Sequence, residues 1–232
     1  MQILRSKSAL AAAVLALIFS GLTPITGTGQ AQELWAHRAY PRLRYQEAGV
    51  GTLQGKAQYC SDCHGPSGQG YRGYYSMPRL AGQTTEYFEN QLQAFVERRR
   101  EANMPMTMSR VHGVSPALRT ALAAHFNALN PPPFGGAAKQ RAGAGKDIYE
   151  QGVPNDNVPA CQVCHGPAAK GTGPIPRLAG QLSSYTVKEL LNWDKERGQG
   201  ANSDTSAVMR PIAHSLSKAQ VESVAAYLSG LE

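Results

Sequence analysis

Apolar residues recur every three or four positions in two matching stretches of the chain: Leu118, Leu122, Phe126 and Leu129, and then Val221, Val224, Leu228 and Leu231. This spacing places each set on one face of an α-helix. Both stretches begin with a helix-start signal, because Ser115 precedes Pro116 and Ser217 precedes Gln220 by three residues.

Helical patterns also cover residues 84–100 and 182–197, whereas the alternating patterns typical of strands are scarce. The sequence therefore predicts an all-α fold.

A separate apolar run occupies residues 9–22, behind Arg5 and Lys7 and ahead of the small residues of Gly29-Gln30-Ala31. A basic start, a short apolar run and small residues at a cleavage point are typical of a secretory signal peptide. The run is short for a membrane span, which needs about 20 apolar residues. We expect residues 1–31 to be a signal peptide cleaved after Ala31, with export to the periplasm; an uncleaved anchor is the alternative.

The rest of the chain repeats itself. C-S-D-C-H at residues 60–64 returns as C-Q-V-C-H at 161–165, and P-R-L-A-G-Q at 78–83 returns unchanged at 176–181. Prolines 131–133 and glycines 135–136 cannot continue a helix and mark the junction. The predicted segments after the signal peptide are an extension at 32–48, a first domain at 49–130, a linker at 131–143 and a second domain at 144–232.

Each C-x-x-C-H motif brings two thiols and an imidazole together, because residues i, i+3 and i+4 share one face of a helical turn. This signature is the covalent attachment site of haem c: the thiols add to the vinyl groups and the histidine ligates iron. The predicted attachment residues are Cys60, Cys63 and His64 in the first domain, and Cys161, Cys164 and His165 in the second. Two covalently attached haem c groups are expected.

Three other interpretations of the cysteines are weaker. A Cys-x-x-Cys disulfide in each motif would be strained and would leave the histidines unexplained. Thioredoxin-like chemistry needs a βαβ pattern, and a shared zinc site needs the two motifs to converge. Haem also supplies apolar bulk to a chain with only 2 Trp and 5 Phe.

A second axial ligand is expected where each domain places methionine before its last helix. Met209 precedes Ser217, and Met108 precedes Ser115 at nearly the same distance, with Met106 as the second choice. The rival ligands are His112 and His214, each three residues before its serine; bis-histidine ligation would lower the redox potential.

Together, the doubled C-x-x-C-H-G, the doubled P-R-L-A-G-Q, the late methionine and the closing Ala225-Ala226-Tyr227 resemble the two-domain dihaem cytochromes of class I, the cytochrome c4 type, over about residues 49–232. The resemblance implies two helical cytochrome c domains, and an electron carrier rather than an enzyme. It implies one-electron transfer in the periplasm between respiratory-chain partners, towards a terminal oxidase or reductase. It also implies that the carbonyls of Pro78 and Pro176 accept the Nδ1–H of the two motif histidines.

Arg79 and Arg177 stand where that family usually has lysine, and each guanidinium could either hold a haem propionate or be solvated. The first domain also has a longer loop with Tyr71, Tyr74 and Tyr75.

The formal charge of +7 is a mild excess that suits an acidic redox protein or loose attraction to anionic lipid. It lacks the dense basic stripe of a nucleic-acid binder. Arg98–Arg100, expected at a helix end, are candidates for the docking surface. The partner is expected to be a membrane oxidase or reductase. The alternatives are a dihaem subunit serving a catalytic dehydrogenase, a dihaem peroxidase, and a gas-binding sensor or structural haem module.

Overall fold

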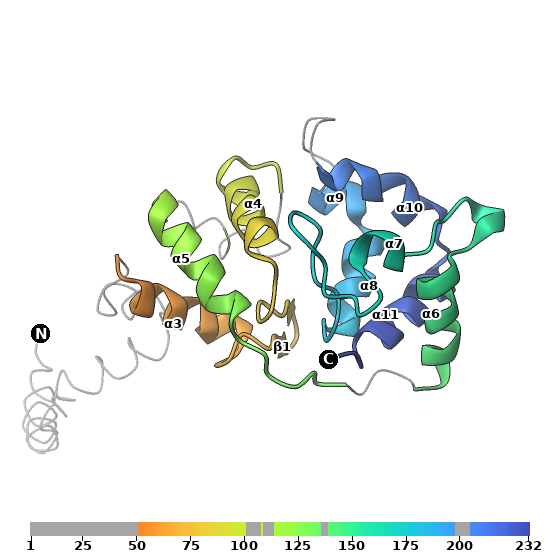
Figure 1. Ribbon diagram of the computed structural model, residues 1–232, viewed down its shortest axis with the longest axis horizontal. Helices are drawn as coiled ribbons and strands as arrows, with labels where there is room; N and C mark the ends of the chain where they lie inside the picture. Colours follow the sequence, from red (N-terminus) through yellow and green to blue (C-terminus); the bar gives the residue numbers. More distant parts are fainter. Residues whose placement is uncertain (1–50, 101–107, 109–113, 136–138, 198–204) are drawn as a thin grey trace, which may run out of the picture. The chain divides into compact units, whose positions relative to one another are not determined.

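The computed structural model describes residues 51–100, 108, 114–135, 139–197 and 205–232, all within one compact unit of the chain (Figure 1). The predicted signal peptide, the extension at 32–48, Met106 and His112 lie outside the described residues. Within the described ranges, no helix combines the length and the apolar character needed to cross a bilayer.

The N-terminal domain is built on three helices, α3 (Leu53–His64), α4 (Thr85–Val96) and α5 (Pro116–Asn127). The predicted start of α5 is confirmed, since the Ser115 hydroxyl accepts a hydrogen bond from the Leu118 amide at 3.2 Å. Helices α4 and α5 lie side by side (Figure 1), with the rings of Phe88 and Phe126 stacked 5.5 Å apart. The longer loop forms a small hairpin of β1 (Tyr71–Arg72) and β2 (Ser76–Met77).

The C-terminal domain has more and shorter elements: α6 (Lys139–Gln151), η2 (Pro154–Asp156), α7 (Gln162–His165), α8 (Ser183–Leu191), α9 (Trp193–Arg197), η3 (Thr205–Val208), α10 (Met209–Ser215) and α11 (Lys218–Leu228). The predicted capping box of Ser217 and Gln220 is confirmed at the start of α11. Helix α11 packs against α6 and α8 around a core that includes Tyr149, Val158 and Val221 (Figure 1). The prediction of an all-α fold is confirmed.

Three boundaries differ from those expected. Helix α6 begins at Lys139, so the last part of the predicted linker is helical; Lys139, Gln140 and Arg141 are good helix formers that outweigh the later glycines. The pattern at 182–197 is divided at Asn192 into α8 and α9. Helix α4 ends at Val96, and the three arginines follow it, with Arg98 at a φ of 55°.

Candidate haem sites

A cavity of about 950 Å³ is lined by residues of both domains. It brings together all of the predicted site residues: Cys60, Cys63, His64, Pro78, Arg79 and Met108, and Cys161, Cys164, His165, Pro176, Arg177 and Met209. The two predicted haem sites therefore open into one continuous space between the domains.

Both motif histidines are buried and have the expected hydrogen bonds. His64 Nδ1 lies 2.8 Å from the Pro78 carbonyl oxygen, and His165 Nδ1 lies 3.0 Å from that of Pro176. Because a carbonyl only accepts, Nδ1 carries the proton and the lone pair remains on Nε2. Burial lowers the pKa of both rings, so that each is a neutral imidazole at neutral pH, the form that ligates a metal.

None of the four motif cysteines forms a disulfide bond. Cys60 and Cys161 are partly buried and Cys63 and Cys164 are exposed; burial raises the pKa of both Cys60 and Cys161 to about 11. Among the described residues, no three His, Cys, Asp or Glu side chains gather as a metal-ion site, so the structure does not support shared zinc binding. An apolar cavity flanked by thiols and neutral imidazoles fits two haem groups attached through thioether bonds.

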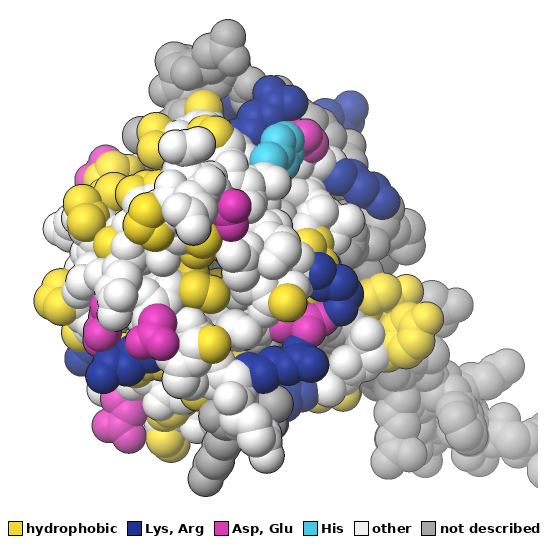
Figure 2. Space-filling model, turned by 90° about the vertical axis from the view of Figure 1, so that its right-hand side faces the viewer, with side chains coloured by type: hydrophobic (Ala, Val, Ile, Leu, Met, Phe, Trp, Pro, Cys, Tyr) yellow, Lys and Arg dark blue, Asp and Glu magenta, His cyan; other side chains and the backbone are white. Residues whose placement is uncertain are grey.

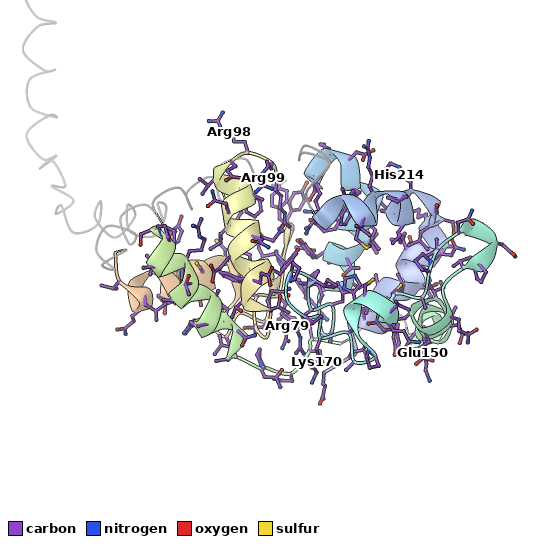
Figure 3. The ribbon with its side chains drawn as sticks, turned by 45° about the horizontal axis from the view of Figure 1, so that its top comes forward. Arg79, Arg98, Arg99, Glu150, Lys170 and His214 are labelled. Atoms are coloured by element: carbon purple, nitrogen blue, oxygen red, sulfur yellow. The ribbon has the colours of Figure 1, made fainter. Side chains whose placement is uncertain are left out.

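The expected sixth ligands and their rivals lie in different places. Met108 and Met209 line the cavity. His214 does not, because its side chain is 52% exposed and its Nε2 lies 3.0 Å from the Asp194 carboxylate; Figure 3 shows it on the outer side of the fold. In the C-terminal domain the structure therefore favours Met209 over His214 as the sixth ligand.

Arg79 and Arg177 are only 4% and 7% exposed, so the solvated alternative is wrong. Arg79 Nε donates to the Ala81 carbonyl at 3.0 Å and its Nη2 donates to the Pro131 carbonyl at 2.8 Å. Arg177 Nε donates to the Ala179 carbonyl at 3.0 Å, but its Nη2 is buried without a partner in the described part of the protein. A charged donor left unpaired beside a haem cavity fits a haem propionate.

Each of these arginines also crosses to the other copy of P-R-L-A-G-Q. A Cβ atom added to Gly82 would lie 3.0 Å from Arg177 Nη1, and one added to Gly180 would lie 3.3 Å from Arg79 Nη1. Both glycines have positive φ values, 71° and 70°. The motif therefore needs glycine both for its turn and for the close approach of the other domain's arginine.

A buried ionic cluster that no sequence pattern predicted lies between the domains. Its members are Tyr87, Arg100, Tyr185, Lys188, Glu189, Glu196 and Arg197. Arg100 Nη2 donates to Tyr185 Oη at 2.6 Å, and Arg197 Nη1 donates to Tyr87 Oη at 3.0 Å, so each arginine reaches across the domain boundary. Arg197 Nε also donates to the Glu189 carboxylate at 2.6 Å.

This cluster corrects the proposed docking role of the three arginines. The Arg100 side chain is only 10% exposed and is committed to the ionic cluster. Arg98 points outward beyond the end of α4 (Figure 3). Of the three, Arg98 is exposed, whereas the part-exposed Arg99 pairs with Glu97 at 2.6 Å.

Comparisons with known proteins agree with this geometry. The family model described as Cytochrome c matches residues 53–130 and 142–232, one range for each C-x-x-C-H motif. Cytochrome c-552 of Acidithiobacillus ferridurans is 40% identical over 193 residues, which cover 79% of this chain and 80% of that protein. The thiosulfate dehydrogenase electron acceptor of Thiomonas intermedia is 32% identical over 183 residues, covering 75% of this chain and 80% of that protein. Among solved structures, the cytochrome c4 of Acidithiobacillus ferrooxidans is 39% identical with a TM-score of 0.64, covering 74% of this chain and 98% of that one.

Proposed function

Because the chain belongs to the cytochrome c family, as a two-domain, dihaem electron-transfer protein of the cytochrome c4 type, we propose that it carries electrons in the periplasm between respiratory-chain partners, towards a terminal oxidase or reductase. Its relatives are electron-transfer proteins rather than enzymes, which sets aside the peroxidase alternative. The observation that carries the proposal is the single cavity that holds both C-x-x-C-H motifs and both candidate methionines.

The cavity residues divide into two ligand sets. Cys60 and Cys63 would bond the first haem covalently, and His64 and Met108 would ligate its iron. Cys161 and Cys164 would bond the second, and His165 and Met209 would ligate its iron. Each haem, when bound, accepts or releases one electron as its iron changes between the ferric and ferrous states.

The protein's own groups hold these sites ready for electron transfer. The Pro78 and Pro176 carbonyls fix the histidine tautomer and orientation, which raises the basicity of Nε2. Arg177 Nη2 offers an unpaired donor for a propionate of the second haem, whereas Arg79 Nη2 already donates to the Pro131 carbonyl. Such unequal surroundings support unequal potentials at the two haems and a preferred direction for the electron.

The test of the ligand sets is the absorption spectrum of the oxidised protein. Methionine ligation of both irons predicts low-spin haems with a near-red sulfur-to-iron band, and a Met209→His variant is expected to lose about half of it. His214→Asn, which changes an exposed residue away from the cavity, is the matched control and should leave the band intact. A high-spin spectrum, or ready binding of carbon monoxide by the wild type, would contradict the proposed ligation.

The signal-peptide pattern and the distribution of surface side chains support the proposed location and the proposed kind of redox partner. The signal-peptide pattern at residues 1–31 supports a periplasmic location. Figure 2 shows Lys and Arg side chains at several places on one face, with hydrophobic side chains and a few acidic groups between them. A mixed apolar and basic surface supports docking on an acidic redox protein, with loose association at an anionic membrane surface as a further element of the proposal.

A second candidate is service as the electron-accepting partner or subunit of a catalytic dehydrogenase. The observation that favours it is the similarity to a protein named as the electron acceptor of thiosulfate dehydrogenase. Stable co-purification with a catalytic chain, and rapid reduction of the purified cytochrome by that chain, would identify this role. A protein that is isolated alone and is reduced only by respiratory-chain components would exclude it.

A further inference from the structure

The two copies of P-R-L-A-G-Q exchange hydrogen bonds through their glutamines. Gln181 Oε1 accepts from the Arg79 amide at 2.8 Å, and Gln181 Nε2 donates to the Arg79 carbonyl at 3.2 Å. Gln83 does the same for Arg177, with distances of 2.7 and 3.2 Å. Both glutamines are buried, so these bonds are shielded from water.

The peptide group that each glutamine binds is the one that anchors the histidine of the other domain. The Pro78 carbonyl and the Arg79 N–H belong to one planar peptide unit. That unit accepts from His64 Nδ1 at 2.8 Å and donates to Gln181 Oε1 at 2.8 Å. The unit between Pro176 and Arg177 joins His165 to Gln83 in the same way.

We propose that Gln83 and Gln181 are positioning residues for the haem of the opposite domain: Gln181 sets the electron donation of His64, and Gln83 that of His165. This inference rests on the proposed axial ligation by the two histidines. Hydrogen bonds linked through one peptide group polarise one another, so a good acceptor at the N–H makes the carbonyl a stronger acceptor from imidazole. A stronger bond at Nδ1 makes the ligand more basic and favours ferric iron.

The direction of the effect follows. Without the glutamine oxygen, the carbonyl accepts more weakly, the histidine is a poorer electron donor and the haem potential rises. The affected haem is in the domain that was not mutated. Each glutamine oxygen also accepts from an amide at the start of the next helix of its own domain, Thr84 for Gln83 and Leu182 for Gln181. If the glutamines only supported that local structure, the potential would change at the haem of the mutated domain instead.

The test is a pair of variants measured on the purified dihaem protein. Gln181→Leu should raise the potential of the first haem and leave the second unchanged, and Gln83→Leu should do the reverse. Proton NMR during stepwise reduction resolves the two haems, and the signals that change in Met209→His belong to the second. The Nδ1 protons of the opposite histidine should also exchange faster with water.

A second substitution separates the electronic effect from loosened packing. Gln181→Glu loses the donor to the Arg79 carbonyl but replaces the amide oxygen with a carboxylate oxygen, which is the stronger acceptor from the Arg79 N–H. The first haem's potential should therefore fall rather than rise. Ser184→Ala is the control, because it removes an exposed bond between domains, Ser76 Oγ to Ser184 Oγ at 2.5 Å, and leaves every hydrogen bond of Gln83 and Gln181 in place. It should move neither potential.

The outcomes are distinct. An unchanged potential at the opposite haem in both leucine variants, or a shift confined to the mutated domain, overturns the inference while the proposed function stands. Equal shifts of one sign for Gln181→Leu and Gln181→Glu also overturn it. A wild-type spectrum without low-spin, histidine-ligated haem would overturn the proposed ligation itself.

Discussion

The carboxyl group of Glu196 lies beside that of Glu189 in the buried ionic cluster. Its side chain is 3% exposed, and its Oε2 lies 3.2 Å from Lys188 Nζ. Burial and a hydrogen bond with Glu189 raise the pKa of Glu196 to about 7. Burial opposes ionisation of Glu189 too, but Arg197 and Arg100 hold the pKa of that group well below its usual range. The pair therefore keeps one proton on Glu196 under mildly acidic conditions.

This raised pKa predicts a pH dependence of stability. Between the ordinary value of 4.5 and about 7 the folded protein binds more protons than the unfolded chain, so the free energy of unfolding falls as pH rises through that window. Glu196→Gln should abolish this fall in the free energy of unfolding, which is on the order of 2 kcal/mol. Guanidinium denaturation at pH 5 and pH 8 measures the free energy of unfolding of both proteins. Equal pH slopes for wild type and variant would contradict the account.

Helix α6 shows how a single missing side chain lets two helices approach. A Cβ atom added to Gly145 would lie 2.0 Å from the Ser223 carbonyl oxygen on α11, which is closer than any real contact. Gly143, two residues earlier on the same helix, has nothing within 4 Å of such an atom. The two glycines look alike in the sequence, yet only Gly145 lies at the crossing with α11.

Alanine at these two positions should therefore have opposite effects. Gly145→Ala forces α6 away from α11 and is expected to destabilise the protein by about 1–3 kcal/mol. Gly143→Ala should be neutral or stabilise it by up to about 1 kcal/mol, because alanine is the better helix former. Thermal unfolding of the two variants compares them directly. Similar melting temperatures would show that α6 and α11 do not meet at Gly145.

At the scale of the whole molecule, the features that depend on neighbouring residues could be predicted from the sequence, but the contacts between the two domains could not. The caps at Ser115 and Ser217 were predictable because their signals span four residues. The docking role predicted for Arg100 was wrong because its partners, Tyr185 and Glu189, belong to the other copy of the domain.

The glutamines show the same limit. The sequence shows Gln83 and Gln181 at equivalent positions of the repeat, but their hydrogen bonds to the opposite domain exist only because the two P-R-L-A-G-Q segments lie against each other.

Arg197 links the two domains through the ionic cluster, and its contribution to stability can be measured. Arg197 Nε donates to Glu189 and its Nη1 reaches Tyr87 of the other domain. Arg197→Leu leaves the Glu189 carboxylate less compensated in the protein interior, and the expected loss is about 3–5 kcal/mol of stability. Arg210→Leu, which breaks an exposed pair with Asp194, should cost under about 1 kcal/mol. Denaturant titration of both variants distinguishes a structural ionic cluster from an incidental one.

The central claim is that one cavity between two domains holds two haem groups bonded to the polypeptide. Mass spectrometry of protein purified from the periplasm of a host competent in haem attachment tests it most directly. The account predicts an intact mass raised by two haems, with one haem on the peptide that contains Cys60 and Cys63 and one on the peptide that contains Cys161 and Cys164. An intact mass equal to that of the bare polypeptide, with four reactive thiols, would contradict it.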